Sequence, residues 1–471
     1  MKKKILLIFI CILLIGTLIP AAATTHQSEI TTAVSSTDNI DWWPQFKHDP
    51  QHTGFSTSKG PETANVLWTY SNTSCGTIGD GVAVVDNRVY AASSGIRHIS
   101  SGALFCLNTS NGAELWSYTF PYEEGNYYSV FGSPTVMDGK VYVCTFGHEA
   151  RAVGHAFCFD AVTGALIWKS QETGFCLYGA TAANGKIYFG TNRFMDSNSS
   201  LFCLSAETGV QLWEKKFRGN SCIDGSPVVF GDNVYVGVAH EPDAGTYCFN
   251  ASTGEKIWVW QEENVEEDVT ASLAIINGKV YFGTQGAMFS VNNIPVRKKG
   301  NMYCVDALNG TLQWNGRLQS RGQYVFSSPC LAYGNVFVCN SAGFNANRNG
   351  KLVCLNDQGY IVWQKKHLSF SSLPMWYISG GGMGTPTVAD NKVYLGTAGF
   401  FRSHLYCFNV TSGKQIWKYS FPTLFGSLLS HGEQFPPSSY FCAPAIVNGR
   451  LYTAWSDSSE TNSIIYCFGD T

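Results

Sequence analysis

The segment from Cys248 to Trp258, which reads CFNASTGEKIW, decides the fold because copies of it recur along the chain. Each copy starts at a cysteine, turns at a glycine and ends at a tryptophan. The other copies are CLNTSNGAELW from Cys106, CFDAVTGALIW from Cys158, CLSAETGVQLW from Cys203, CVDALNGTLQW from Cys304, CLNDQGYIVW from Cys354 and CFNVTSGKQIW from Cys407. Successive tryptophans lie 45 to 56 residues apart. A β-rich repeat of this length is typical of a β-propeller, in which one repeat forms one four-stranded blade.

Each repeat predicts four strands, named A to D. The block Ser226–Val236, SPVVFGDNVYV, has two apolar runs joined by a Gly-Asp-Asn turn, which is a hairpin pattern. Its relatives precede the cysteine in the other repeats and predict strands A and B. Strands C and D surround the turn Asn250–Gly254, where Asn and Gly suit the backbone of a tight turn. The tryptophan that ends strand D is expected to dock between blades, as Trp68, Trp116, Trp168, Trp213, Trp258, Trp314, Trp363 and Trp417.

The two ends of the chain share an eighth repeat. Tyr466–Thr471, YCFGDT, starts a copy that has no tryptophan, and Val66–Tyr70, VLWTY, resembles the end of a copy that has no beginning. We therefore predict an all-β, eight-bladed β-propeller of four-stranded antiparallel blades. The strand around Trp68 pairs with the C-terminal blade and closes the ring, which leaves no open sheet edge at that blade.

The chain has 471 residues and a net charge of −3, and it lacks the basic stripe expected of a nucleic-acid-binding protein. Residues 1–23 are predicted to be a signal peptide, with three lysines, an apolar run and a small-residue cleavage site. An uncleaved anchor is the alternative. Residues 24–40 form a Ser/Thr-rich tether, and residues 41–471 form the propeller. These features predict a secreted, extracellular or cell-envelope protein.

Sixteen cysteines would suggest disulfides in a secreted chain, but eight of them are repeat-equivalent and too far apart to bridge. We expect most of these to be small buried residues. Cys144 precedes Cys158, and Cys339 precedes Cys354, across an expected B–C hairpin. Cross-strand disulfides Cys144–Cys158 and Cys339–Cys354 are a hypothesis, with free thiols as the alternative. The chain has no Cys-x-x-Cys pair, so no metal site is predicted.

The D–A and B–C connections are long and differ between repeats, and both are expected on one face of the propeller. Variable loops on a rigid scaffold commonly carry binding residues. We predict a ligand or partner face there, in which aromatic side chains form a platform and cations form a rim. The alternatives are aromatics that pack the loops down and cations that are simply solvated. The predicted residues are Tyr127, Tyr128, Trp376, Tyr377, Phe435, Tyr440, Arg97, Arg151, Arg402 and His404.

The repeated block C-x-N/D-x-x-x-G-x-x-x-W resembles the tryptophan-docking motif of the pyrroloquinoline-quinone (PQQ) repeat family, with cysteine in place of that family's alanine. The segment Trp43–Asp49, WPQFKHD, followed by Thr53-Gly54, is also similar to the opening segment of secreted members. The resemblance covers about residues 41 to 471 and implies a quinoprotein alcohol dehydrogenase-like propeller. Dehydrogenases of this fold hold the quinone between a tryptophan and a disulfide of adjacent cysteines, and this chain has no Cys-Cys pair.

The resemblance and the missing motif together predict a monomeric binding or scaffold propeller that recognises a cell-envelope protein or glycan and has no catalytic residues. No cofactor is predicted. The alternative is a PQQ- and calcium-dependent dehydrogenase with a divergent site, for which an acidic and amide cluster at the central channel would be the sign. A polysaccharide-active protein is a third reading, which would need two carboxylates in one cleft.

Overall fold

The computed structural model describes residues 40–72, 76–95, 100–121, 127–147, 154–192, 199–262, 268–285, 288–291, 294–297, 300–316, 318, 323–325, 327–342, 350–366, 384–397, 403–421, 440–456 and 463–471. The predicted signal peptide and almost all of the tether lie outside these residues. The unit from Ile40 to Thr471 is all-β in its described part, and its strands form eight blades. The prediction of fold class is confirmed.

Each blade is a meander whose strands A to D follow one another in the sheet. The first four are β3 (Ala83–Val85), β4 (Arg88–Ala92), β5 (Ala103–Asn108) and β6 (Glu114–Thr119); β8 (Thr135–Met137), β9 (Lys140–Cys144), β11 (Ala156–Asp160) and β12 (Leu166–Lys169); β13 (Thr181–Ala183), β14 (Lys186–Gly190), β15 (Ser200–Ser205) and β16 (Gln211–Lys216); and β17 (Val228–Phe230), β18 (Asn233–Val238), β19 (Gly245–Asn250) and β20 (Lys256–Trp260).

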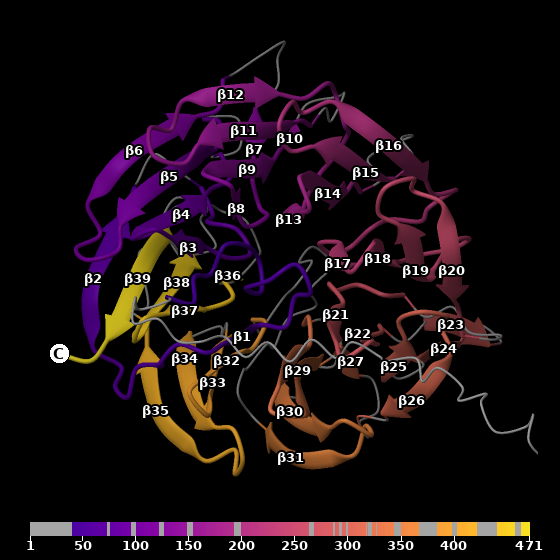
Figure 1. Cartoon of the computed structure of the whole chain (residues 1–471). Coiled ribbons are helices and arrows are strands. Elements are labelled where there is room, and N and C mark those ends of the chain that lie inside the picture. Colours follow the sequence, from indigo (N-terminus) through magenta and orange to yellow (C-terminus); the bar gives the residue numbers. More distant parts are fainter. Residues whose placement is uncertain are drawn as a thin grey trace, which may run out of the picture. The chain divides into compact units, whose positions relative to one another are not determined.

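The next four blades follow the same plan. They are β21 (Ala274–Ile276), β22 (Lys279–Gly283), β25 (Met302–Asp306) and β26 (Leu312–Gly316); β28 (Cys330–Ala332), β29 (Asn335–Ala342), β30 (Lys351–Asn356) and β31 (Ile361–Lys366); β32 (Thr387–Ala389), β33 (Lys392–Thr397), β34 (His404–Asn409) and β35 (Gln415–Ser420); and β37 (Ala445–Val447), β38 (Arg450–Ser456), β39 (Ser463–Gly469) and β2 (Val66–Ser71). Figure 1 shows the blades around one centre, with the A strands innermost and the D strands at the rim.

Blade 8 is built from both ends of the chain, as predicted. Strand β2 pairs antiparallel with β39, and Trp68 lies opposite Cys467. The carboxylate of Asp470 accepts hydrogen bonds from the backbone N–H groups of Glu62 and Thr63, at 3.0 Å each for the shorter contacts. In the other blades the C–D turn is one continuous stretch of chain. In blade 8 this turn is interrupted, and the hydrogen bonds of Asp470 join its two halves.

The seams between blades are closed by side chains, because each four-stranded sheet is separate from its neighbours. At the seam between blades 4 and 5, the indole N–H of Trp258 and the hydroxyl of Tyr235 both donate to the carbonyl oxygen of Ala307, at 3.0 and 3.1 Å. The same indole bond recurs at all eight seams, at 2.7 to 3.3 Å. The acceptors, from Trp68 onward, are the carbonyls of Thr109, Ala161, Ala206, Ala251, Ala307, Asp357, Val410 and Pro61.

Each repeat cysteine lies between the two aromatic residues that reach the seam. In blade 4, Cys248 is opposite Tyr235 on one side and opposite Trp258 on the other. Its side chain is fully buried. A small residue is needed here, because two large rings flank it in a close-packed interior.

The two disulfide hypotheses are wrong. All fourteen described cysteines are free thiols. The register places Cys144 opposite Ala156 and Cys339 opposite Leu352, so each cysteine is two positions away from the partner that was predicted for it. The other proposed member of each pair is the repeat cysteine of its blade, which faces an aromatic residue instead.

The segment from Asp41 to Gly60, here called the belt, runs along the inner strands of the blades. The residue in the middle of each A strand in blades 1 to 7 donates its backbone N–H to the belt, at 2.7 to 3.1 Å. The acceptors, in order, are the carbonyl oxygens of Trp43 and Pro44, the side-chain oxygen of Gln45, and the carbonyl oxygens of Pro50, Gln51, Thr53 and Gly54. Strand β1 (Phe55–Ser56) then pairs in parallel with β32. The belt therefore fixes seven inner strands to one segment.

Two ionisable side chains of the belt are fully buried. The Lys47 ammonium has no hydrogen-bond partner among the described residues, and burial lowers the pKa of Lys47 to about 8. His52 Nε2 lies 3.0 Å from the hydroxyl of Thr181, and burial lowers the pKa of His52 to about 3. His52 is therefore neutral at physiological pH.

A third ionisable residue, His48, is charged. Burial by itself would lower the pKa of His48, but hydrogen bonds to Asp41 and Asp49, at 2.9 and 3.3 Å, outweigh it and raise the pKa to about 9. The same contacts keep the pKa of both carboxyl groups below their usual value, against the effect of burial.

The seam contact can be tested with two glycines of blade 5. Gly310 and Gly278 both have positive φ, at +71° and +70°, so alanine is strained at either position. A Cβ on Gly310 would lie 2.7 Å from the ring of Trp258, whereas a Cβ on Gly278 meets nothing within 4 Å. We expect Gly310→Ala to lower the free energy of unfolding by at least about 1 kcal/mol more than Gly278→Ala, by displacing the indole. Chemical denaturation of both variants measures this, and equal losses would contradict the role of the seam.

The belt can be tested through pH. His48 has a raised pKa in the folded protein, so its contribution is complete below the unfolded pKa of about 6.5 and is lost as pH rises through about 9. We expect His48→Gln to lower the melting temperature at pH 6 and to lose this effect by pH 10. Asp41→Asn should weaken the same alkaline dependence, since Asp41 is one of the two carboxylate partners of His48. A His48→Gln deficit that stays constant from pH 6 to 10 would show that the imidazole acts only by packing.

Candidate functional site

The D–A and B–C loops meet at the same end of the blades, as expected. In blade 2, β7 (Tyr128–Ser129) of the D–A loop pairs with β10 (Phe146–Gly147) of the B–C loop. In blade 6, β27 (Gln323–Val325) pairs with the end of β29, and in blade 8, β36 (Tyr440–Phe441) pairs with the end of β38. In blade 5, β23 (Met288–Val291) and β24 (Ile294–Arg297) form a hairpin within the B–C loop. This end of the propeller is called the loop face below.

The predicted face residues have different outcomes. Tyr128 is buried against His155 and Phe157, with ring centroids 5.6 and 6.3 Å away, so it packs its loop down and is not part of an exposed platform. Tyr127 is partly exposed. His404 begins β34 and its Nδ1 lies 3.0 Å from the hydroxyl of Ser420. The backbone of Tyr440 is in β36. The predictions Arg97, Arg151, Trp376, Tyr377, Arg402 and Phe435 lie outside the described residues.

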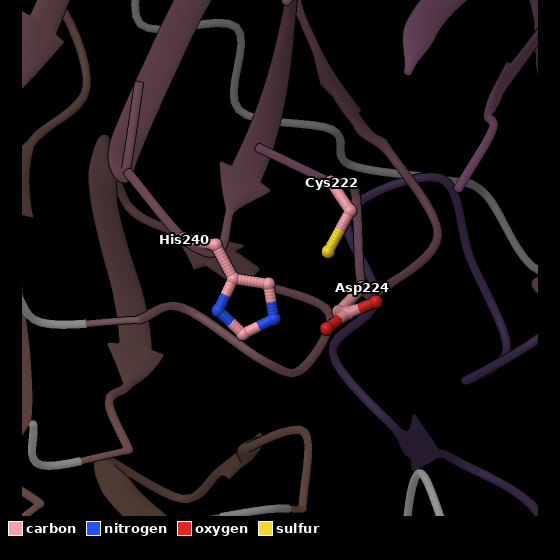
Figure 2. Close-up of side chains that lie close together, drawn as sticks. All are labelled: Cys222, Asp224 and His240. Carbon is pink, nitrogen blue, oxygen red and sulfur yellow. The ribbon is translucent and has the colours of Figure 1, made fainter. Parts of the chain in front are cut away.

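A cluster that the sequence analysis did not identify lies at the loop face of blade 4. It consists of Cys222, Asp224 and His240, and Figure 2 shows their side chains close together. The thiol sulfur, one carboxylate oxygen and one imidazole nitrogen all lie within 4.8 Å of one another. Cys222 and Asp224 come from the D–A loop and His240 from the B–C loop. The two loops are joined there by an isolated bridge between Cys222 and Ala239.

His240 is fixed by a carboxylate from the next blade. The side chain of Asp268 accepts a hydrogen bond from the backbone N–H of His240 at 2.6 Å and lies 3.2 Å from its Nδ1. The backbone of His240 has φ of +63°, an unusual value for a residue other than glycine. The bond to Asp268 occupies Nδ1, so Nε2 is the nitrogen that can serve a ligand.

Asp224 is fixed from the preceding blade. Asn192 donates from its amide nitrogen to one carboxylate oxygen of Asp224 at 2.9 Å. The amide oxygen of Asn192 is buried and has no partner among the described residues. A buried acceptor without a donor is costly, and such a group is commonly explained by a water molecule or an ion that it meets.

All three groups of the cluster have a raised pKa. Burial raises the pKa of the Cys222 thiol well above its usual value, and the Asp224 carboxyl is raised in the same way. The pKa of His240 is raised chiefly by its hydrogen bond to Asp268, against burial. Without a cation, the cluster therefore tends to keep a neutral thiol next to a carboxyl that is easier to protonate than usual.

The prediction of no metal ligands depended on the search for a Cys-x-x-Cys pair. That search could not find this cluster, because its members lie on two loops joined only by strand register. A signal existed in the sequence nonetheless. Cys222-Ile223-Asp224 occupies a stretch just before strand A where other repeats mostly carry apolar residues, and His240 directly follows strand B of the same repeat.

A carboxylate that is one position removed from that of Asp224 in the repeat is Asp80 of blade 1. Asp80 lies four residues before Val84, the middle residue of strand A, whereas Asp224 lies five residues before the equivalent Val229. Burial raises the pKa of Asp80 to about 7. Thr77 stands where blade 4 has Cys222, and Gly95 stands where it has His240, so Asp80 has neither a cysteine nor a histidine in the repeat-equivalent positions.

The eight seams, the split blade and the docking tryptophans define a quinoprotein-like eight-bladed propeller. The chain belongs to the PQQ-repeat family described as outer membrane protein assembly factor BamB, whose model matches residues 57–193 and 152–419. Within the part of the chain that the structure describes, no helix is long and apolar enough to cross a membrane.

Three comparisons show how broad this family is. The chain is 27% identical over 319 residues to the dehydrogenase subunit of a quinone alcohol dehydrogenase from Gluconobacter oxydans, matching 61% of this chain but only 36% of that protein. It is 23% identical over 397 residues to tetrathionate hydrolase from Acidithiobacillus ferrooxidans, matching 79% of this chain and 70% of that protein. The crystal structure of BamB from Moraxella catarrhalis superposes with a TM-score of 0.57 at 14% identity, over 86% of this chain and 100% of that one. Enzymes and an assembly factor thus share the fold.

The environment of Asp80 predicts a pH effect on stability. Its pKa is raised in the folded protein, so the carboxyl costs stability as pH rises from about 4, where the unfolded chain ionises, to about 7. We expect the melting temperature of Asp80→Asn to exceed that of the wild type by a margin that grows between pH 4 and 7 and is then constant. Thermal melts across this range measure it. The exposed Asp232→Asn is the control, and a parallel pH dependence of wild type and Asp80→Asn would contradict the prediction.

Proposed function

We propose that this protein is a binding or scaffold propeller of the cell surface or cell envelope, without catalysis of its own, that recognises a protein or glycan partner with its loop face. The strongest support is that the two ends of each blade carry different kinds of connection. The D–A and B–C loops of a blade are joined by short pairings at the loop face, whereas the A–B turns at the other end are tight. Irregular loops on a rigid ring are where recognition residues are commonly found.

The belt supports the same proposal. The backbone N–H groups of seven inner strands are bonded to it, and the side chains of Lys47 and His52 are buried between it and the blades. This arrangement makes the ring a rigid support and leaves recognition to the loops. The likeness to an outer membrane protein assembly factor fits this reading, since the match covers 100% of that chain.

The runner-up is a PQQ- and calcium-dependent dehydrogenase with a divergent site. One observation favours it: Asp224 and Asn192 form a carboxylate-amide pair on the loop face, directly before an inner strand. The quinone alcohol dehydrogenase relative adds to it, although this chain spans 36% of that protein's length. The two proposals make opposite predictions for a cofactor titration.

The proposed function is tested by photo-cross-linking in intact cells. A benzophenone side chain is placed at Tyr127 or at the exposed Glu172, both on D–A loops, and at Ile257 as a control, because its side chain is 47% exposed on the outer strand of blade 4. We expect one discrete cross-linked species from the two loop positions and none from Ile257. Protease and glycosidase digestion then separates a protein partner from a glycan.

Two results would contradict the proposal. Equal cross-linking from the loop positions and from Ile257 would place no recognition at the loop face. In a parallel titration of the purified protein, quinone absorbance retained after gel filtration in the presence of calcium would favour the dehydrogenase.

A further inference from the structure

We propose that Cys222, Asp224 and His240 bind one zinc ion at the loop face of blade 4. This goes beyond the recognition function proposed above and does not depend on it. The donor set is one thiolate, one imidazole nitrogen and one carboxylate oxygen, held on two loops of one blade. Zinc is a borderline cation that binds all three donor types, usually in a tetrahedron.

The distances fit a site that closes around its ion. The three donor atoms lie within 4.8 Å of one another. Zinc–ligand bonds of about 2.0 to 2.3 Å place neighbouring donors in a tetrahedron roughly 3.5 Å apart. The side chains need to move together by roughly 1 Å, which a χ rotation of Asp224 or His240 provides, since neither is fully buried.

The donor chemistry selects among cations. Calcium and magnesium take oxygen ligands, and this cluster offers one carboxylate beside a thiol and an imidazole. Thiolate and imidazole favour zinc and its first-row neighbours. On binding, Cys222 loses its thiol proton to solvent and coordinates as a thiolate, and Asp224 and Nε2 of His240 release to solvent any proton that they carry. The bound site has no net charge, because one thiolate and one carboxylate balance the divalent cation.

The supporting residues have the arrangement that metal sites use. Asp268 bonds His240 through Nδ1, and a carboxylate behind a ligating histidine fixes the ring and leaves Nε2 for the metal. Asn192 bonds one oxygen of Asp224 and leaves the other for the ion. The buried amide oxygen of Asn192, which has no described partner, is an acceptor for a water molecule in the fourth position.

The three ligands lie on two loops of blade 4, and their supporting residues come from the blades on either side. Cys222 and Asp224 lie on the D–A loop of blade 4, His240 lies on its B–C loop, and Asn192 and Asp268 come from blades 3 and 5. An ion bound here joins the two loops of blade 4 next to the bridge between Cys222 and Ala239. The described residues supply three donors, and we assign the fourth position to a water molecule.

The test is a metal titration of the purified, reduced protein after treatment with a chelator. We expect one equivalent of zinc to remain after gel filtration, measured by elemental analysis. Cobalt(II) should bind in its place and give a near-ultraviolet thiolate-to-cobalt charge-transfer band. Cys222→Ser should abolish the band, and Asp224→Asn and His240→Gln should each weaken zinc binding at least tenfold. Asp268→Asn should weaken it by about 10- to 100-fold, because the histidine loses its support.

The controls separate this site from the other thiols. Cys442→Ser removes a buried thiol from the D–A loop of blade 8, and Asp232→Asn removes an exposed carboxylate from the far end of blade 4. Both should bind zinc as the wild type does. His240→Gln keeps the test valid if Cys222→Ser does not fold, because the side chain of His240 is 50% exposed. Less than one equivalent of bound metal, or a cobalt band that survives both Cys222→Ser and His240→Gln, would overturn the proposal.

Discussion

The contact between a tryptophan and the glycine turn of the next blade is the interaction on which this ring depends. Within the described residues no β-ladder joins one blade to the next, and only isolated contacts such as the bridge between Gly81 and Ala443 cross a seam. Seven of the eight seams are closed by an indole that lies on a glycine and donates to a carbonyl, as Trp258 does to Ala307 above Gly310, whereas at the eighth Trp417 donates to Pro61. The glycine is required for two reasons, its positive φ and the ring that occupies the place of a Cβ. Cysteine, glycine and tryptophan recur together because one seam needs all three.

This explains which parts of the fold could be predicted from sequence. The seam motif lies within eleven residues, so each copy is visible locally, and the half copies at Trp68 and Cys467 predicted the closure of blade 8. The disulfides failed because pairing was inferred from order along the chain, whereas a bridge depends on register, and Cys144 is opposite Ala156. The cluster around Cys222 was missed for the same reason, since its ligands meet only after the loops of blade 4 pair. Tyr128 was assigned to an exposed face because a sequence does not show which loop aromatics turn inward.

The belt supplies hydrogen-bond acceptors that the repeats themselves do not provide. The A strands are innermost, and apart from β32, which also pairs with β1 of the belt, each described A strand forms a ladder only with its B strand, so the inner edges carry N–H groups that need acceptors. The belt accepts from the middle N–H of seven of these strands, and its positive-φ residues Lys47, His48 and His52 let it turn from one blade to the next. The sequence of this segment is similar to that of secreted PQQ-repeat proteins. The repeat period, however, does not predict where the segment lies in the ring. It belongs to no repeat and contacts almost all of them.

A metal bound at blade 4 would affect how the two loops of that blade are held together. The loops of blade 2 are joined by two paired residues on each strand, Tyr128–Ser129 with Phe146–Gly147. Those of blade 4 are joined by the isolated bridge of Cys222 with Ala239 and by side chains, since Arg218 bonds to Asp243 and the Ser221 hydroxyl donates to the carbonyl oxygen of His240. His240 follows the bridge with an unusual positive φ and is held by Asp268 of the next blade. Zinc between His240 and Cys222 would add metal coordination to these hydrogen bonds.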